Sequence, residues 1–311
     1  MKGNNFLSIV DLKPEEVGRM VESASRMKHR ETSRSLEGKT IALLFEKPSL
    51  RTRVSFEVGI QQLGGRCFYL SRDDVGLGVR EPESDVAGVL DRMVDGVVAR
   101  VFSHKSLEIL AADTSIPIIN ALSDLSHPCQ AVGDLLTMLE HKGDFRGLNV
   151  GFVGDGNNIS GSLALACSSL GANFTVATPT SYKIPDSVWE QSQVRSLETG
   201  SEIQWVEDPQ DAVRASDVVY TDVWISMGDE SEREERLKAF KGYQVDELLF
   251  AEAKPDAIFM HDMPAHRGEE ISENMLDHSN SVVYQQAENR LHAQKALLLM
   301  LIGSRDKSAK K

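Results

Sequence analysis

The sequence lacks most of the features that mark secreted, membrane-bound or nucleic-acid-binding proteins. It has only 3 cysteines in 311 residues, and Cys67, Cys129 and Cys167 lie too far apart for a metal or redox motif. Lys and Arg number 34 against 47 Asp and Glu, a net charge of −13, which disfavours a binder of nucleic acid or anionic membranes. No apolar run approaches the ~18 residues of a membrane span, and the N-terminus has no apolar signal-peptide core. We therefore expect a cytoplasmic protein that binds neither nucleic acid nor a membrane.

What the sequence does contain is enough apolar residue for two domains. Hydrophobic residues make up 41% and charged residues 26%, and a domain typically takes about 150 residues. The negative charge is uneven, because residues 1–140 carry a net charge of −3 and residues 141–311 carry −10. The charged segment His141–Gly147 separates the two halves and is the predicted domain boundary.

Short apolar runs alternate with segments of helical period along the whole chain. The predicted strands are Thr40–Phe45, Arg66–Leu70, Gly96–Phe102, Ile116–Asn120, Leu148–Val153, Asn173–Thr178, Ser201–Val206, Asp217–Thr221 and Ala257–His261. The predicted helices are Thr52–Leu63, Ser84–Arg92, Lys105–Ala112, Pro128–Glu140, Ser160–Leu170, Asp186–Leu197 and Ala287–Leu301.

This alternation indicates βαβ units and parallel sheets. We predict an α/β fold of two doubly wound parallel-sheet domains, residues 1–142 and 143–311, with the active site in the cleft between them. The C-terminal helix is expected to pack back on the first domain. Ligands of such sheets bind beyond the carboxyl ends of the strands.

Two glycine motifs look like nucleotide-binding loops but lack necessary residues. The segment GDGNNI, which begins at Gly154, has Ile159 in place of the third glycine, and no acidic residue ends the following strand. The triplet GKT ending at Thr40 has Ser33 where a phosphate loop needs glycine, and a strand follows it rather than a helix. A nucleotide-binding oxidoreductase is therefore disfavoured.

The segment FEKPSLRTRVSFE, residues 45–57, combines a strand end with a helix start. Ser49 is predicted to cap this helix, whose unpaired N–H groups and positive dipole end attract anions. Ser49 and Thr52 add hydroxyl donors, and Arg51 adds a forked guanidinium that fits phosphate oxygens. From these residues alone, an anion site and an ordinary capped helix start are equally consistent.

Five motifs, in order along the chain, resemble those of the aspartate and ornithine carbamoyltransferase family. Ser49-Leu-Arg-Thr52 is similar to the carbamoyl-phosphate signature, and His127-Pro-Cys-Gln130 to the second phosphate-side motif. The other three are GDGNN at 154–158, DVWISMG at 222–228 and AENR at 287–290, of which the first two resemble the ornithine branch. The matches extend over nearly the whole chain.

The resemblance implies transfer of the carbamoyl group of carbamoyl phosphate to the side-chain amine of L-ornithine, which gives L-citrulline and phosphate. This is a reaction of arginine metabolism, and its anabolic or catabolic direction stays open. No metal or organic cofactor is implied, because phosphate is already an activated leaving group. Two alternatives remain: transfer to another amine, such as putrescine or a modified ornithine, and a non-catalytic paralogue that binds anionic metabolites.

For the donor, the resemblance implies an anion cradle and hydrogen-bond donors aimed at the developing oxyanion. The carbamoyl-phosphate residues are Ser49, Leu50, Arg51, Thr52, Arg100, His127, Gln130, Asp262, Met263 and Arg290, of which Arg100, His127 and Asp262 are the predicted catalytic residues. Because His127 precedes Pro128, a favoured first helical residue, its ring can point out of the helix start and donate to the carbonyl oxygen.

For the acceptor, the resemblance implies that ornithine is bound by Asn158, Asp222, Ser226 and Met227. Asp222 would pair with the α-ammonium group, and Trp224 is expected to be a packing anchor of the same loop. The charged run DESEREER, residues 229–236, is either a solvated helix face or a mobile lid that closes over the amino acid.

Asp262 departs from the family pattern, since members of the ornithine type have cysteine at this position. Its carboxylate could pair with the side-chain ammonium of ornithine, but the pairing would raise the pKa of an amine that must be neutral to attack. We therefore expect Asp262 either to aid binding and shift the pH optimum upward, or to select a different amine. The backbone carbonyls of residues 262 and 263 can still accept hydrogen bonds from the carbamoyl –NH₂ group.

The resemblance also implies a homotrimer or a multiple of trimers. The segment Asp73–Glu81 matches a loop that reaches toward a neighbouring subunit's site in related enzymes. Its polar contact residues are not clearly preserved, so Arg80 could add charge at an interface or lie on a simple exposed loop.

Overall fold

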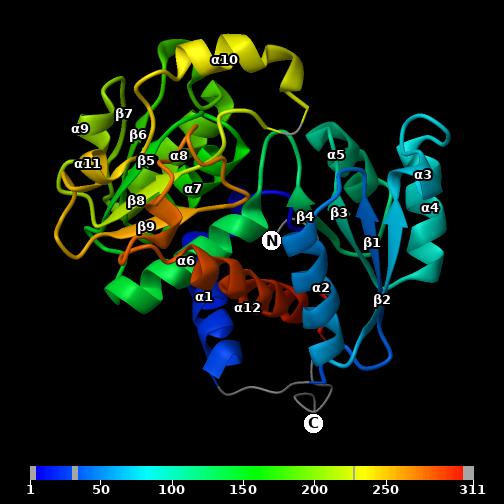
Figure 1. Ribbon diagram of the computed structural model, residues 1–311. Helices are drawn as coiled ribbons and strands as arrows, with labels where there is room; N and C mark the ends of the chain where they lie inside the picture. The colour runs from blue at the N-terminus through cyan, green and yellow to red at the C-terminus, as the bar shows by residue number, and fades with distance from the viewer. Residues whose placement is uncertain (1–4, 30–33, 227, 304–311) are drawn as a thin grey trace. The chain divides into compact units, whose positions relative to one another are not determined.

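Nine strands, all paired in parallel, form two separate sheets in residues 5–29, 34–226 and 228–303, the part of the chain that the computed structural model describes (Figure 1). The strand order is β2-β1-β3-β4 in the first sheet and β7-β6-β5-β8-β9 in the second. Each sheet lies in its own compact unit. Unit 1 comprises Met1–Leu136 and Glu288–Lys311, and unit 2 comprises Thr137–Ala287. The predicted fold class of two parallel-sheet α/β domains is confirmed.

Unit 1 has four strands with helices on both faces of the sheet. The strands are β1 (Thr40–Phe45), β2 (Arg66–Ser71), β3 (Gly96–Arg100) and β4 (Ile118–Leu122). The helices are η1 (Ile9–Asp11), α1 (Pro14–His29), α2 (Leu50–Gln62), α3 (Arg72–Val75), α4 (Glu83–Met93) and α5 (His104–Ala112). The long helices α6 (Pro128–Lys142) and α12 (Val283–Leu301) contribute residues to both units.

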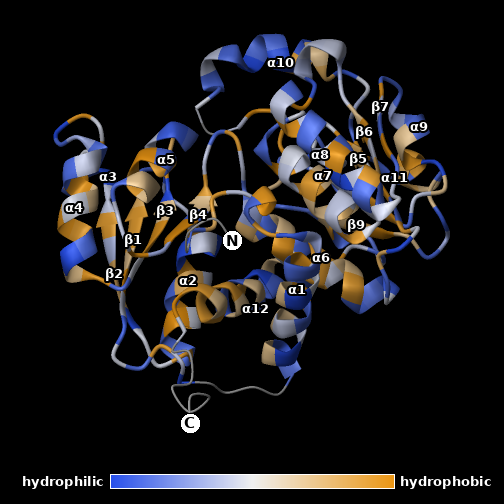
Figure 2. Cartoon of the chain, turned by 180° about the vertical axis from the view of Figure 1, so that it is seen from behind, coloured by the Kyte–Doolittle hydropathy of each residue, from blue (hydrophilic) through white to orange (hydrophobic). Residues whose placement is uncertain are grey.

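The first sheet is buried on both faces, which explains the continuous apolar sequence of its central strand. Ala42 and Leu44 of β1 pack in one core with Leu90 of α4 and Leu107 of α5. Because side chains alternate along a strand, the equally buried Leu43 faces the other side, where Figure 1 shows α2. In Figure 2 the hydrophobic colours of β1 reflect this burial.

Unit 2 has five strands: β5 (Asn149–Val153), β6 (Asn173–Ala177), β7 (Ile203–Val206), β8 (Val218–Thr221) and β9 (Ile258–His261). Its helices are α7 (Asn158–Leu170), α8 (Asp186–Thr199), α9 (Pro209–Val213), α10 (Arg233–Ala239) and α11 (Glu247–Phe250), with single turns η2 (Thr180–Tyr182), η3 (Glu230–Glu232) and η4 (Met275–Asp277). Val153, Val219 and Phe259 of the central strands share one core with residues of α9 and α11. In contrast to β1, helix α10 is mainly hydrophilic (Figure 2).

The loop after β5 needs glycine because another segment approaches it closely. A Cβ atom at Gly156 would lie 2.2 Å from the backbone carbon of Lys183, which no side chain tolerates. The Gly156 amide donates to the carbonyl of Tyr182 at 2.8 Å. Glycine here therefore serves to join the 154–158 loop to η2, and not to admit a dinucleotide.

Several sequence predictions about element bounds were wrong. β7 begins at Ile203 and not at Ser201, and α12 begins at Val283 and not at Ala287. The fourth strand begins at Ile118 and not at Ile116, because Pro117 has no N–H to donate to the ladder. The third strand ends at Arg100 and not at Phe102. Its pairing with β4 shifts register between Ala99 and Arg100, directly before this end. The segment Asp73–Glu81, expected to be a loop, begins inside the helical turn α3.

Several helices were missed entirely, among them α1, α9 and α11. The signal for α1 was present, since Pro14 occupies a first helical position and two glutamates follow it. In the described part of the chain, no helix is both long enough and apolar enough to cross a membrane.

Candidate functional site

The start of α2 has the geometry of an anion site. Ser49 caps the helix as predicted, because its Oγ accepts a hydrogen bond from the Thr52 amide at 3.2 Å. Leu50 is the first helical residue and its side chain is 74% exposed, so it contributes its backbone rather than its side chain. Thr52 is fully buried and its Oγ1 accepts a hydrogen bond from Nη2 of Arg290 in α12. This bond joins two predicted site residues that lie 238 positions apart in the sequence.

A histidine and three arginines share one electrostatic environment in unit 1. His127 precedes α6 and is buried, as is Arg100 at the end of β3. Burial lowers the pKa of His127 well below its usual value, and the nearby charges of Arg290, Arg100 and Arg51 lower it further. The imidazole is therefore neutral at physiological pH, and one of its nitrogens carries a proton that it can donate.

The buried side chain of Gln130 is held in one orientation. Its Nε2 donates to Oδ1 of Asp134 at 2.8 Å. This bond identifies the nitrogen and the oxygen of the side-chain amide, because a carboxylate accepts only from the –NH₂ group. Oε1 then points the other way, is buried, and accepts no hydrogen bond from the residues that the structure describes. Gln130 thus presents an acceptor, which suits the –NH₂ of a carbamoyl group.

Arg290 reaches this cluster because α12 approaches α6 closely. A Cβ atom at Gly133 of α6 would lie 3.3 Å from Cγ and 3.4 Å from Cα of Arg290. Glycine therefore permits the helix contact that presents the guanidinium to Thr52. Nothing in the local sequence around Gly133 indicated this role.

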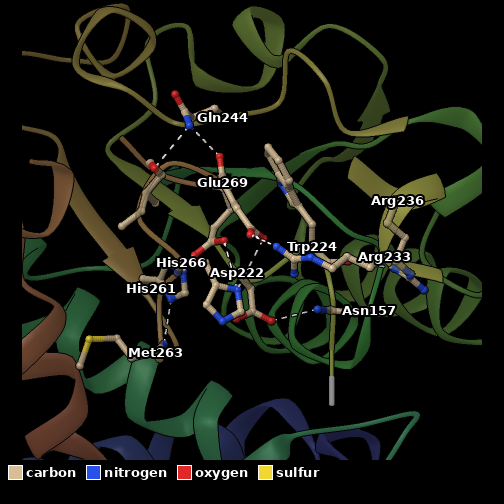
Figure 3. A network of polar contacts seen from close by, with 12 residues as sticks. Asn157, Asp222, Trp224, Arg233, Arg236, Gln244, His261, Met263, His266 and Glu269 are labelled. Carbon is tan, nitrogen blue, oxygen red and sulfur yellow. Dashed lines mark hydrogen bonds and ion pairs between the residues drawn. The ribbon is translucent and has the colours of Figure 1, made fainter. Parts of the chain in front are cut away.

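The start of α7 in unit 2 holds an aspartate in place (Figure 3). Asn157 caps the helix, and its Oδ1 accepts from the amides of Ile159 at 2.9 Å and Ser160 at 3.2 Å. Its Nδ2 donates to Oδ2 of Asp222 at 2.9 Å. The predicted residue Asn158 is half-buried at the first position of α7. Asn157 was not among the predicted site residues, although an asparagine directly before a helix is a common cap.

Asp222 and Asp262 lie at the carboxyl ends of neighbouring strands. Thr221 of β8 pairs with His261 of β9, so each aspartate is the next residue after a paired position. Burial raises the pKa of Asp222 to about 7, and the negative charge of Asp262 adds to the rise. The hydrogen bond from Asn157 acts in the opposite direction. The structure therefore brings these two predicted site residues together.

The loop that carries Asp262 is held by a buried histidine (Figure 3). Nδ1 of His261 accepts a hydrogen bond from the Met263 amide at 2.8 Å, so the ring proton resides on Nε2. Nε2 lies 3.1 Å from Oε1 of the fully buried Glu270, which can accept it. Met263 has a φ of 56°, a left-handed conformation that is uncommon for a side chain of this kind. His261 and Glu270 thus orient the 262–263 backbone, and neither was predicted to do so.

The 222–228 loop is anchored by aromatic packing. Trp224 is buried and stacks on Phe240, with ring centroids 5.6 Å apart and planes inclined by 14°, which confirms the predicted packing role. The carbonyl of Ser226 accepts from the Asp229 amide at 3.0 Å. Met227, also predicted to bind ornithine, lies outside the described residues. The charged run that follows forms η3 and part of α10.

Among the described residues, His266, Glu269 and Glu270 place ligand atoms within 4.8 Å of one another, as a metal site would require. Both carboxylates already have partners, however. Glu269 pairs with Arg233, and Oε1 of Glu270 accepts from the His266 amide and faces His261 (Figure 3). The arrangement is therefore explained without an ion.

Comparison with known proteins identifies two matching family models. Residues 4–140 match the carbamoyl-phosphate-binding domain of aspartate/ornithine carbamoyltransferase. Residues 146–301 match the Asp/Orn-binding domain of the same family. Together the two models account for almost all of the chain.

Individual relatives are similar over the same extent. A protein of Thermococcus kodakarensis described as ornithine carbamoyltransferase is 50% identical over 307 residues, which is 97% of this chain and 98% of that protein. A Pyrococcus furiosus protein described as anabolic ornithine carbamoyltransferase is 47% identical over 307 residues, 97% of this chain and 98% of that protein. A solved structure of ornithine carbamoyltransferase from P. furiosus superposes with a TM-score of 0.93 at 47% identity, covering 96% of this chain and 97% of that one.

Proposed function

Since the chain belongs to the aspartate/ornithine carbamoyltransferase family, we propose that it is an ornithine carbamoyltransferase. It transfers the carbamoyl group of carbamoyl phosphate to the side-chain amine of L-ornithine and releases L-citrulline and phosphate. The observation that carries this proposal is the cluster in unit 1. There burial and the charges of three arginines lower the pKa of the neutral His127, and one of them, Arg51, lies in the first turn of the capped helix α2. The anabolic P. furiosus relative supports a role in arginine biosynthesis.

The phosphate of the donor is bound by the start of α2. Ser49, Leu50, Arg51 and Thr52 supply hydroxyl groups, backbone N–H groups and a guanidinium, which together match a tetrahedral anion. Arg290, bonded to Thr52, adds a second forked cation. These groups also stabilise the phosphate as it leaves, because its charge grows when the C–O bond to the carbamoyl group breaks.

The carbonyl of the donor is polarised by Arg100 and His127. Attack by the amine pushes negative charge onto the carbonyl oxygen, and both side chains can donate hydrogen bonds to it. A neutral His127 suits this role, because it donates one proton without adding a fourth positive charge to the cluster. Gln130 and the backbone carbonyls of Asp262 and Met263 would accept from the carbamoyl –NH₂ and fix its plane.

The acceptor is assigned to Asn158, Asp222, Ser226 and Met227. The carboxylate of Asp222 would pair with the α-ammonium group, and Asn157 holds that carboxylate in position. The side-chain amine must lose a proton before it attacks, and we assign Asp262 to bind and orient it. Replacing Asp262 with cysteine should then move the pH optimum for citrulline formation downward, and an unchanged pH–rate profile would contradict this role.

We propose further that residues 1–142 form the carbamoyl-phosphate-binding domain and residues 143–311 the ornithine-binding domain, a division that the two family models support. The C-terminal helix would pack back on the first domain, in agreement with the place of Glu288–Lys311 in unit 1. Assembly as a homotrimer or a multiple of trimers, and a location in the cytoplasm, are also proposals. They rest on the family resemblance and the composition, and sedimentation of the purified protein tests the assembly.

A second candidate, a carbamoyltransferase for another amine, is favoured by one observation. Asp262 replaces the family's cysteine and lies where it raises the pKa of Asp222, so the amine side carries an additional carboxylate. The deciding experiment supplies carbamoyl phosphate with ornithine, putrescine, lysine and N-modified ornithines, and measures ureido product and phosphate. Ornithine should be preferred by kcat/KM. Faster turnover of putrescine than of ornithine would replace the acceptor assignment. If no acceptor in the panel gave a ureido product, the enzyme assignment would be refuted.

A further inference from the structure

One arginine of the charged 229–236 run does not behave as a solvated residue. Arg236 of α10 has only 12% of its side chain exposed, whereas the residues before it on the same helix are exposed. Its Nη1 donates to Oδ2 of Asp155 at 2.8 Å and to the carbonyl of Trp224 at 3.1 Å. Its other nitrogens reach Asp229 at 3.4 Å and Glu232 at 3.0 Å. A guanidinium is suited to this many partners because it carries five N–H donors in a fixed plane.

The partners of Arg236 belong to two loops that the proposed function assigns to the amino acid. Asp155 lies in the 154–158 loop, two residues before the Asn157 that holds Asp222. Trp224 lies in the 222–228 loop, two residues after Asp222 itself. Arg236 also lies over the ring of Tyr182, 5.0 Å from its centroid, in the turn that receives the Gly156 amide. One side chain of α10 therefore contacts both loops and the segment that supports the first of them.

Asp155 depends on this contact. It is buried, and burial raises its pKa to about 6, while Arg236 acts to keep it ionised and the negative charge of Asp229 acts against it. Loss of one member of a buried ion pair leaves the other charge in a poorly solvating environment, so the local backbone has to rearrange. A displacement of about 1 Å at a substrate-holding loop is enough to reduce activity strongly.

We propose that Asp155 and Arg236 are positioning residues that lock the 154–158 and 222–228 loops to α10 and thereby set the KM for the amino-acid substrate. The proposal rests on the assignment of these loops to ornithine. We assign neither side chain a contact with the substrate, since they pair with each other and Arg236 also donates to the loop backbone. The charged run is then neither a plain solvated face nor a separate lid, because Arg236 ties it to the binding loops.

The test compares Arg236→Gln, Asp155→Asn, the double variant and Arg236→Lys with the wild-type enzyme. Lys238→Gln is the matched control, since it removes the same charge from an exposed position of the same helix. We expect Arg236→Gln to raise the KM for ornithine about 10- to 100-fold while the KM for carbamoyl phosphate changes less than about twofold. Asp155→Asn should act in the same direction, and the double variant should be no worse than Arg236→Gln, because the two residues form one coupled unit.

Arg236→Lys separates positioning from folding. Lysine keeps the charge but cannot contact Asp155 and the Trp224 carbonyl with one planar group. The KM of this variant for ornithine should therefore be intermediate between the values of the wild type and of Arg236→Gln. Thermal unfolding of each variant identifies any that fail to fold, and Arg236→Lys then carries the test. Equal rises in both KM values, or a loss in kcat alone, would overturn the proposal. The proposed function is checked separately by the wild type, whose failure to carbamoylate ornithine would refute that assignment instead.

Discussion

The two units place opposite charges at the same kind of position. In unit 1, Arg51, Arg100 and Arg290 act on His127 near the ends of strands and the start of α2. In unit 2, Asp222 and Asp262 follow the ends of neighbouring strands. Both clusters lie at the carboxyl ends of parallel strands, where helix starts and loops converge. The same architecture thus carries a cluster of cations in one unit and a pair of carboxylates in the other, which the proposed function assigns to the anionic and the cationic substrate.

The two clusters differ in how burial affects their charge. An arginine stays protonated at any ordinary pH, so burial costs unit 1 energy without neutralising its cations. Burial of a carboxylate instead favours its neutral form, and the pKa values of Asp155 and Asp222 rise to about 6 and about 7. The pKa of His127 is lowered well below its usual value, so this histidine does not titrate near neutral pH. We therefore expect the amino-acid side to respond to pH near neutrality and the phosphate side to be insensitive.

The largest effect should come from the cationic cluster. Arg51→Ala removes a guanidinium from the proposed phosphate cradle, and we expect kcat/KM for carbamoyl phosphate to fall about 10³-fold. Steady-state kinetics with each substrate varied in turn measures the change. Arg53→Ala is the matched control, because Arg53 lies on the same helix, has 46% of its side chain exposed and pairs only with Glu57 as an ion pair in the described residues. Equal losses of kcat/KM in the two variants would show that Arg51 has no special role in binding carbamoyl phosphate.

On the carboxylate side, Asp222→Asn should cost somewhat less. The substitution keeps the shape of the side chain but removes the charge that we propose pairs with the α-ammonium group. We expect kcat/KM for ornithine to fall about 100-fold, while carbamoyl phosphate binds as before. Calorimetry with carbamoyl phosphate alone provides the second measurement. A comparable loss of carbamoyl-phosphate affinity would show that the two clusters are not separable.

A smaller effect tests the origin of the pH response. Asp262→Asn removes a negative charge that raises the pKa of Asp222, so that pKa should fall. In the proposed assignment the carboxylate form of Asp222 binds the ammonium group. The decline of kcat/KM for ornithine on the acidic side should therefore move to lower pH. The titration of the substrate itself is common to both enzymes and cancels in the comparison. If the acidic-side decline of kcat/KM stayed at the same pH, a group other than Asp222 would be responsible for it.

The same substitution makes a linked prediction about stability. The folded protein holds a proton on Asp222 between its usual pKa of 3.8 and its raised pKa of about 7, whereas the unfolded chain releases it. The free energy of unfolding therefore declines as the pH rises through this window. In Asp262→Asn this decline should be shallower and end at lower pH, as urea unfolding at a series of pH values would detect. A profile parallel to that of the wild type would contradict the coupling.

The smallest effect concerns how Arg290 is presented. Gly133→Ala adds a methyl group 3.3 to 3.4 Å from Arg290, and we expect it to lower the free energy of unfolding by about 1 kcal/mol and to weaken carbamoyl-phosphate binding. Gly88→Ala in α4 is the control, because its methyl would meet only the end of Arg92 at 3.8 Å. That change should stabilise the protein by about 0.5–1 kcal/mol through helix propensity. If both variants changed the free energy of unfolding in the same direction, the close contact between Gly133 and Arg290 would not explain the effect.

The fold class and most strands could be predicted because they depend on local patterns. The first strand, Thr40–Phe45, and the cap at Ser49 agree with the structure residue for residue. Apolar runs and capping residues act over a few positions, so the chain displays them directly. The fourth strand was displaced by two residues because the missing N–H of Pro117 outweighs the apolar character of Ile116.

The contacts among candidate site residues were harder to predict. The roles of Asn157, Arg236 and Glu270 depend on partners 65, 81 and 9 positions away, and only the folded chain brings these together. Arg236 in particular lies in a run of charges that looks uniformly solvated in the sequence. Burial of one member of such a run depends on the helix orientation and on what packs against it.

The sequence by itself determined the alternation of strands and helices, the motifs that resemble a carbamoyltransferase, and the unequal charge of the two halves. Those properties are set by the identity and order of neighbouring residues. Only the tertiary structure decided that Thr52 bonds Arg290, that His127 is neutral and that Asp222 titrates near pH 7. Such properties depend on burial and on charges brought close in space, and neither is fixed until the sheets are assembled.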